Sequence, residues 1–391
     1  DADNLEAIYT LCNTDHPVGY NGYSMSVSDV VELEDTSSII VLADGLGSGV
    51  KANILSTMTS RILTTMIAEG ANIEECVRTI MEALPVCRER GMNYCTFTIV
   101  YIRPTGTGII YEYDNPGVIL WKGGKCCDPE STQIQIEGKT LNRSEFCLRS
   151  GDAIVVMSDG VLFAGPNEVM NYDWQRPQIM QYLERSIRPG MSAMALSALL
   201  AGACMDLYCG VPGDDTTVAV VSLKRPHAVS VLIGPPVDRN REMEHVHHFM
   251  EEGDSHIVCG GTTSELVATY LDKELVLQPT TGFRTVPPYS TLEGIELVTE
   301  GALTIDYVVK LAQRHLDPRA LGLKRYNGNN GAEKMAELLF EKATDITMFI
   351  GKTVNDAHAG TVADSGRKRK NVEKLCQLLR DMGKNVVEIY H

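Results

Sequence analysis

Short apolar runs alternate with longer amphipathic stretches along residues 1–225. Apolar runs bounded by Gly, Pro, Asn or Asp are typical of strands, whereas apolar residues at a helical spacing predict helices. The pattern predicts strands at 5–13, 23–33, 38–43, 94–102, 108–113, 118–121 and 216–223, one or two more strands within 146–157, and helices at 50–69, 73–84, 175–187 and 192–208. Strands, a helix pair, further strands, a second helix pair and a closing strand predict a layered α+β sandwich. In the helix over 50–69, Ile54, Met58, Ile62, Thr65 and Met66 lie on one stripe, the side that an amphipathic helix buries.

The segment Lys224-Arg225-Pro226 marks a change of pattern. Beyond it, strands and helices alternate, which predicts a parallel, doubly wound α/β domain. The predicted strands are 229–233, 255–258, 346–350 and 386–390, and the predicted helices are 239–251, 263–271, 305–315, 332–342 and 372–382. We therefore expect one domain over 1–225 and another over 226–391. Residues 278–296 contain several Pro and Gly and predict a long irregular loop, a kind of segment that is often functional.

Composition narrows the class of protein. The net charge is −16, and the first fifty residues contain no Lys or Arg, so no broad basic face is expected to bind nucleic acid or an anionic membrane. Eleven cysteines without a Cys-x-x-Cys pair, several in apolar runs such as those of Cys95 and Cys259, predict reduced, buried thiols in a cytoplasmic protein. No apolar stretch reaches transmembrane length and no signal peptide is visible. Because the chain does not begin with Met, a longer protein with a preceding N-terminal region is a further expectation.

Three acidic motifs occur at the ends of apolar strands. Buried carboxylates at such places are unfavourable unless something compensates their charge, and a shared divalent cation is the obvious candidate. The first motif is rich in glycine, but its spacing is neither Gly-x-Gly-x-x-Gly nor a P-loop with its Lys. The motifs are Ala43-Asp44-Gly45-Leu46-Gly47-Ser48-Gly49, Ser158-Asp159-Gly160 and Gly213-Asp214-Asp215-Thr216-Thr217-Val218.

In this order, Asp-Gly-x-Gly-x-Gly, Ser-Asp-Gly and Asp-Asp-x-Thr-Val resemble the metal-dependent serine/threonine protein phosphatases of the PPM family. The match is closest to the bacterial SpoIIE/RsbU-like branch and extends over roughly residues 5–224. The resemblance implies a β-sandwich flanked by helix pairs, in agreement with the predicted elements. It also implies a function in sporulation or stress signalling, with a phosphoprotein substrate that is often of the anti-anti-sigma type.

The resemblance further implies a dinuclear Mn²⁺ or Mg²⁺ centre. Asp44 matches the bridging aspartate, Gly45 the residue whose carbonyl is a ligand, Asp159 and Asp214 the later ligands, and Asp215 the adjoining acid. Oxygen ligands of this kind suit both cations. Two such ions would hold a hydroxide and orient the phosphoryl group, so phosphoserine or phosphothreonine would be hydrolysed without a covalent phospho-enzyme.

One position departs from the family pattern. Tyr23, in Asn21-Gly22-Tyr23-Ser24, stands where an early acid is expected. A neutral phenol with a pKa of about 10 is a poor ligand for these ions. Asp15 and Asp29 do not replace it directly, because six residues of strand span about 20 Å. One metal site is therefore expected to be weakened, and an alternative hypothesis is a catalytically weakened signalling module that binds a phosphoprotein or small ligand without turnover.

The second domain offers weaker candidates, and each has an ordinary structural alternative. His245 and His248 could share a helix face and bind a metal, or lie on an exposed helix surface. The segment Gly260–Ser264 follows a strand and opens a helix, so it could bind an anion or small ligand, or be a plain helix cap at Thr262 or Thr263. Asn355-Asp356-Ala357-His358 could share the same crevice at the carboxyl ends of the strands. Partner docking, anion sensing and homodimer formation all stay open for this domain, and no Gly-x-Ser-x-Gly motif supports a serine hydrolase.

Overall fold

The chain forms two compact units, Asp1–Arg225 and Pro226–His391, in a computed structural model. Each unit has its own sheets, helices and hydrophobic core. The described residues are 6–14, 26–33, 35, 37–45, 50–83, 95–165, 174–188, 191–210, 214–236, 238–278, 288–316, 330–351 and 362–391.

The first unit is a sandwich of two antiparallel sheets, with strand orders β1-β11-β10-β6-β7 and β2-β3-β4-β5-β9-β8. Its strands are β1 (Glu6–Thr14), β2 (Ser26–Glu32), β3 (Ser38–Gly45), β4 (Cys95–Ile102), β5 (Thr107–Tyr113), β6 (Ile119–Lys122), β7 (Lys125–Cys127), β8 (Ser131–Ile136), β9 (Lys139–Cys147), β10 (Ala153–Met157) and β11 (Thr216–Lys224). Strand β3 is apolar from Ile39 to Ala43, as expected for a strand that is buried on both faces. Ile40 and Leu42 belong to the core between the sheets, whereas Ile39 and Val41 belong to the core under the helices.

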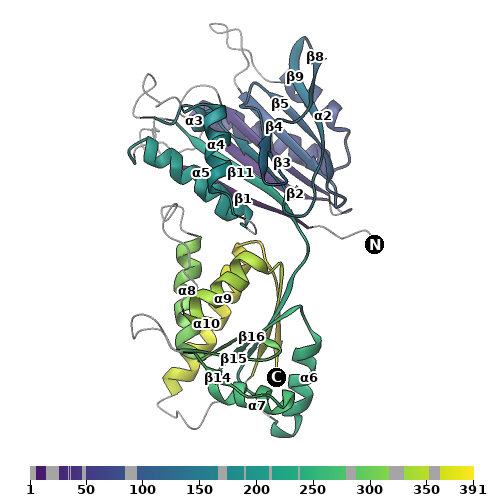
Figure 1. The fold of residues 1–391 in the computed structure, drawn as a ribbon. Coiled ribbons are helices and arrows are strands. Elements are labelled where there is room, and N and C mark those ends of the chain that lie inside the picture. Colours follow the sequence, from purple (N-terminus) through teal and green to yellow (C-terminus); the bar gives the residue numbers. More distant parts are fainter. Residues whose placement is uncertain are drawn as a thin grey trace. The chain divides into compact units, whose positions relative to one another are not determined.

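Helices cover both outer faces of this sandwich (Figure 1). The helices are α1 (Val50–Ala68), α2 (Ile73–Ala83), α3 (Asp159–Leu162), α4 (Arg176–Ser186) and α5 (Ala193–Leu207). Helices α1 and α2 share a core with the six-stranded sheet, while α5 packs on β1 and β11 and α4 on β7. The resulting layers of helices, sheet, sheet and helices confirm the α+β sandwich predicted from the sequence.

The orientation of α1 corrects the sequence prediction. Ile54 and Met58, which the predicted stripe would bury, are 49% and 52% exposed. The buried face carries smaller residues, among them Ala52, together with Leu63. The reason is the short distance between α1 and β3: a Cβ atom on Gly45 would lie 2.3 Å from the carbonyl oxygen of Ala52. Backbones this close leave no room for long side chains, so small residues face the sheet near Ala52. Farther along the helix, Leu63 and Ile67 are buried, and Ile62 and Met66 of the predicted stripe pack partly against the same core.

Strands β7, β8 and the first part of β9 were not predicted from the sequence. Strand β8 exposes Ser131, Thr132 and Gln133 and buries only Ile136 at its end. It lies at the edge of its sheet. A strand at an edge with a solvated face needs no apolar run, so the pattern that reveals the central strands is missing here.

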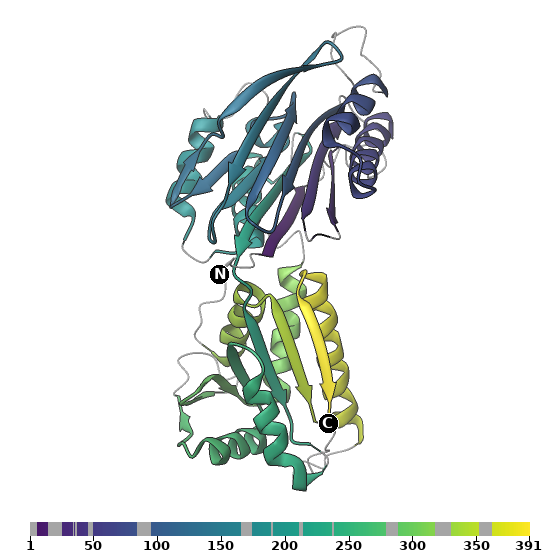
Figure 2. The ribbon, with the colours of Figure 1, turned by 90° about the vertical axis from the view of Figure 1, so that its right-hand side faces the viewer.

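The second unit contains one seven-stranded sheet with the order β14-β15-β16-β13-β12-β17-β18 (Figure 2). Its strands are β12 (Ala228–Ile233), β13 (Ser255–Cys259), β14 (Val276–Leu277), β15 (Tyr289–Leu292), β16 (Ile295–Thr299), β17 (Asp345–Ile350) and β18 (Asn385–Tyr390). The five strands from β16 to β18 are parallel, and β14 and β15 add an antiparallel edge. The irregular loop predicted over 278–296 is therefore wrong in part, since β15 and the start of β16 lie within it; residues 279–287 lie outside the described residues.

Helices lie on both faces of this sheet, which confirms the doubly wound α/β prediction. They are η1 (Arg239–Arg241), α6 (Glu242–Glu251), α7 (Gly261–Leu271), α8 (Ala302–His315), α9 (Gly331–Ala336), its π-helical continuation η3 (Glu337–Lys342), and α10 (Val362–Asp381). Helices α6 and α7 pack on one face, and α8, α9, η3 and α10 on the other. The chain therefore leaves the neighbouring strands β13 and β16 toward opposite faces of the sheet. In open α/β sheets, ligands bind outside the carboxyl ends of strands at such a point.

Candidate functional site

The first acidic motif lies at the end of β3. Asp44 is paired in register with Thr96 of β4. The Thr96 hydroxyl donates to Asn115 Oδ1 at 2.6 Å and lies 3.4 Å from the backbone oxygen of Asp44. The apolar run that forms β3 thus places a half-buried carboxyl at the end of a central strand.

The second and third motifs meet because β10 and β11 are neighbouring strands, with Met157 opposite Val218. The backbone N–H of Ser158 donates to Thr217 at 3.0 Å. The Ser158 hydroxyl donates to the Asp215 carbonyl at 3.1 Å and accepts the N–H of Thr217 at 2.9 Å. Asp159 and the acids before β11 are thereby held next to each other.

Gly160 permits this close contact between the two motifs. A Cβ atom at this position would lie 2.4 Å from the backbone oxygen of Asp215 and 2.9 Å from the Thr216 hydroxyl. The carbonyl of Gly160 also accepts the hydroxyl of Tyr208, the residue directly after α5, at 2.7 Å. Larger residues at 160 would separate Asp159 from the third motif.

The carboxyl groups of the three motifs interact electrostatically. Burial raises the pKa of Asp44 to about 8, and the negative charges of Asp159, Asp214 and Asp215 and a hydrogen bond with Asp159 act in the same direction. Desolvation also raises the pKa of Asp159, although this residue is open to solvent on one side. The Gly160 N–H and the bond to Asp44 partly oppose that increase. The charges of three acids from two other segments therefore act on Asp44 at one place.

The chemistry of these donors fits a divalent cation, since bound positive charge would relieve the repulsion at Asp44. Within the described ranges, however, no three His, Cys, Asp or Glu side chains are gathered closely enough to hold a metal ion. The segments 46–49 and 211–213, which adjoin Asp44 and Asp214, lie outside these ranges, as do Asp15 and Tyr23. The predicted effect of Tyr23 on one metal site stays a prediction.

A comparison with known protein families identifies the family of the first unit. The model of the Stage II sporulation protein E (SpoIIE) family matches residues 34–224. The first unit contains a SpoIIE domain. This confirms the resemblance to the SpoIIE-like branch inferred from the three motifs. A second family model, the YodL-like domain, matches residues 1–47 and so overlaps the start of the SpoIIE domain.

The relatives of the SpoIIE domain are distant in sequence. Stage II sporulation protein E of Bacillus subtilis is 24% identical over 234 residues, which cover 58% of this chain but only 26% of that protein. A solved structure of the PP2C phosphatase domain of Bacillus subtilis SpoIIE with a fragment of its regulatory domain is 20% identical, with a TM-score of 0.48, covering 56% of this chain and 64% of that one. The RsbU and RsbW domains of a Mycobacterium tuberculosis protein are 16% identical, with a TM-score of 0.47, covering 63% and 69%. Among the described residues, the helices are too short or too polar to cross a bilayer.

Both histidines singled out in the second unit lie on α6, but their environments differ. His245 is 4% exposed and packs edge-on against Phe349, with its ring centre 3.9 Å from that of His391. The exposed-surface interpretation is therefore wrong for His245 and right for His248. Sequence alone missed this burial because His245 lies in a mostly polar stretch, with Glu242 and Glu244 before it and His247 and His248 after it.

The helix cap expected at Thr262 or Thr263 is also wrong. Helix α7 begins after Gly260, which caps it without a side-chain hydrogen bond. The Ser264 hydroxyl donates instead to the carbonyl of Gly261 at 2.7 Å. The segment 355–358 lies outside the described residues.

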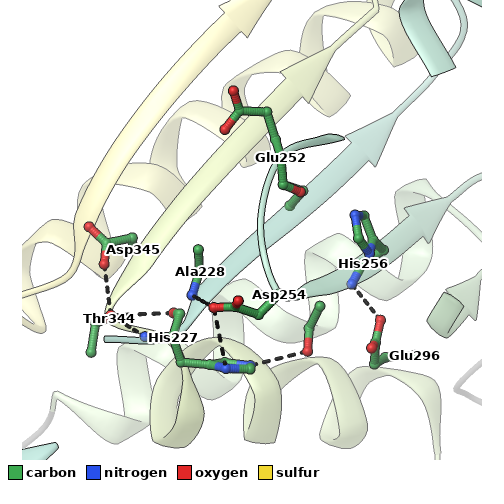
Figure 3. A network of polar contacts seen from close by, with 10 residues as sticks. His227, Ala228, Glu252, Asp254, His256, Glu296, Thr344 and Asp345 are labelled. Carbon is green, nitrogen blue, oxygen red and sulfur yellow. Dashed lines mark hydrogen bonds and ion pairs between the residues drawn. The ribbon is translucent and has the colours of Figure 1, made fainter. Parts of the chain in front are cut away.

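His227 and Asp254 meet at the amino-terminal ends of β12 and β13 in the second unit (Figure 3). The His227 ring lies 3.1 Å from the Ser255 hydroxyl and 3.8 Å from the Asp254 carboxyl. Ser255 is only 6% exposed, and the Asp254 carboxyl accepts the N–H of Ala228 at 2.9 Å. The contacts of this network link the amino-terminal ends of β12 and β13, so we assign it a structural role.

Proposed function

We propose that the SpoIIE domain is a divalent-cation-dependent phosphatase that hydrolyses phosphoserine or phosphothreonine on a phosphoprotein. The observation that carries this proposal is the meeting of Asp44 with Asp159, Asp214 and Asp215, acids from three segments that interact at one place. Acids that repel one another in this way are unfavourable in a folded protein unless they bind cations.

Two Mn²⁺ or Mg²⁺ ions would be held by Asp44, the Gly45 carbonyl, Asp159, Asp214 and Asp215. When bound, such ions activate water as a nucleophile and neutralise the charge of the phosphoryl group. The protein positions these ligands: Gly160 lets the second motif approach the third, and strand pairing at β3 fixes Asp44. With Tyr23 at the early acid position, we expect one of the two ions to bind more weakly.

The test compares the intact chain with Asp44→Asn. Phosphate release is measured with Mn²⁺ from p-nitrophenyl phosphate and from a phosphoserine peptide, and Mn²⁺ binding is measured separately by electron paramagnetic resonance. We expect the substitution to lower turnover roughly 100-fold or more and to weaken Mn²⁺ binding, because groups that act directly on the transition state have effects of this size.

The matched control is Asp114→Asn, which removes the same charge from an exposed turn with a φ of 52°. Asparagine tolerates this backbone conformation, so folding and turnover should both be preserved. Equal turnover in the intact chain and in Asp44→Asn would reject the proposed site.

The second candidate function is a phosphatase-like module that binds a phosphoprotein without hydrolysing it. It is favoured by the absence, among the described residues, of three donors already gathered for a metal. Mn²⁺ binding with no phosphate release from either substrate would support this function over the first.

The partner we infer is a small phosphoprotein of the anti-anti-sigma type, in sporulation or stress signalling. The matched relatives include Stage II sporulation protein E, and one solved structure with a similar fold comes from work on the bacterial stressosome. The described cysteines are all free thiols, which supports a reducing cytoplasmic location. Pull-down of a phosphorylated partner by the intact chain, lost on dephosphorylation, would test the partner class directly.

A further inference from the structure

Two helices of the second unit begin next to each other at the carboxyl ends of β13 and β16. Helix α7 is capped by Gly260 and helix α8 by Gly301, and neither cap makes a side-chain hydrogen bond. A Cβ atom on Gly301 would lie 3.5 Å from the Cα of Gly260. The N–H of Gly260 donates to Thr299, the last residue of β16, at 2.9 Å. The two helices diverge to opposite faces of the sheet from this junction.

The first turn of a helix carries N–H groups that have no partner inside the helix, and the helix dipole adds partial positive charge there. One such turn is common and by itself says little. Here two turns meet, and neither is closed by a serine, threonine or aspartate cap. A negatively charged group at the junction would interact with both turns.

Gly261, the first residue of α7, has no packing reason to be glycine. Apart from its chain neighbours and the backbone of its own helix, no heavy atom of the described residues lies within 4 Å of the place where its Cβ would stand. It also does not share the positive φ of 122° that favours glycine at 260. Glycine inside a helix is less favourable than alanine. As far as the described residues go, the backbone of the first turn of α7 is open to a ligand at this place.

Thr304 provides an independent sign of a ligand. It is the third residue of α8 and 1% exposed, yet its hydroxyl has no hydrogen-bond partner among the described residues. A buried hydroxyl without a partner is unfavourable, so native structures rarely retain one without a reason. In a helix the Cα–Cβ bond leans toward the N-terminus, which here is the junction of Gly301 and Gly260.

We propose that this junction binds the phosphate group of a small molecule, through the first-turn N–H groups of α7 and the hydroxyl of Thr304. Phosphate offers more acceptor oxygens and more charge than a carboxylate, so it can accept from both helices at once. The site belongs to the second unit alone and does not depend on the proposed phosphatase activity of the SpoIIE domain.

The test uses the full chain in buffer stripped of divalent cations, so that the acidic cluster of the first unit offers no cation-bridged phosphate site. Inorganic phosphate and pyrophosphate are titrated by calorimetry, and the thermal midpoint is compared with that in chloride at matched ionic strength. We expect measurable binding and a higher midpoint with either phosphate probe.

Gly261→Asp places a carboxylate in the open space, where a first-turn acid favours the helix but repels an anion. We expect at least a tenfold loss of affinity with folding preserved. The matched control is Gln178→Asp, an exposed position in the first turn of α4 in the other unit, which should bind phosphate as the intact chain does.

Thr304→Val removes the buried hydroxyl and keeps its shape. We expect a higher midpoint without phosphate and weaker phosphate binding, a combination that a purely structural hydroxyl would not produce. Absence of binding in the intact chain, or equal affinity in the intact chain and Gly261→Asp, would overturn the proposal. If Gly261→Asp does not fold, unchanged affinity in Thr304→Val would overturn it.

Discussion

The side-chain oxygen of Ser158 accepts the backbone N–H of Thr217 at 2.9 Å, and both residues are fully buried. The same hydroxyl donates to the backbone oxygen of Asp215 at 3.1 Å. One small side chain therefore links the acidic segment after β10 to the acidic segment before β11. Its position beside Asp159 means that it acts on the arrangement of the acids.

Ser158→Ala should destabilise the protein and lower phosphate release together. The substitution leaves a buried N–H and a buried carbonyl with one partner fewer, which costs about 1–3 kcal/mol of unfolding free energy. Denaturant unfolding and the Mn²⁺-dependent assay would measure the two effects, and Ser158→Thr should restore part of both. Ser197→Ala is the matched control, because this buried serine donates to the Met194 carbonyl within α5. A similar loss of activity in both alanine variants would contradict the positioning role of Ser158.

Gly160→Ala should be far more harmful than Gly117→Ala. A Cβ at 160 would stand 2.4 Å from a backbone oxygen, whereas a Cβ at 117 would be at an ordinary 3.6 Å from the Arg176 side chain. Overpacking against backbone typically costs about 1–3 kcal/mol. Chemical denaturation of the two variants would measure this difference, and equal stabilities would show that the turn at 160 can move.

The orientation of α1 leads to a prediction that opposes its sequence pattern. Met58→Lys should change the unfolding free energy by no more than about 0.5 kcal/mol, since Met58 is 52% exposed. Leu63→Ala should cost about 2–5 kcal/mol, because Leu63 is completely buried against the sheet. If Met58→Lys were the more damaging variant, the face assigned to α1 would be wrong.

His245 should make stability depend on pH. Burial, followed by the nearby His391 and His248, lowers the pKa of His245 from 6.5 to about 4. In the unfolded chain, His245 therefore binds a proton below about pH 6.5. In the folded chain it does not bind one until the pH reaches about 4. Above pH 6.5, His245 therefore does not lower the free energy of unfolding. As the pH falls from 6.5 toward 4, this free energy decreases by up to about 1.4 kcal/mol per pH unit.

Denaturant unfolding from pH 7 to pH 4 would measure that slope. His245→Phe keeps an aromatic ring beside Phe349 and removes the titrating group, so its stability should fall less steeply than that of the intact chain. His247→Gln is the control, because His247 is exposed on the same helix. Parallel pH profiles for the intact chain and His245→Phe would refute the assignment.

The positions of the three acidic motifs followed from the sequence alone. Each motif adjoins an apolar run, and such runs report strands through local spacing between near neighbours. The same local signals gave the helix pairs of the first unit and the alternating elements of the second. Edge strands such as β8 were missed, since a solvated strand has no apolar run to recognise.

The arrangement of the site depended on contacts between residues far apart in the chain. Asp44 and Asp159 interact only because strands of two different sheets end near one another, and no local pattern encodes that distance. The buried face of α1 was decided by how closely its backbone approaches β3, and the burial of His245 by Phe349 and His391 packing onto α6. Sequence thus determined which residues could do chemistry and where strands would end. The tertiary structure decided which of them meet, because backbone separation and desolvation are properties of packed elements and not of neighbouring residues.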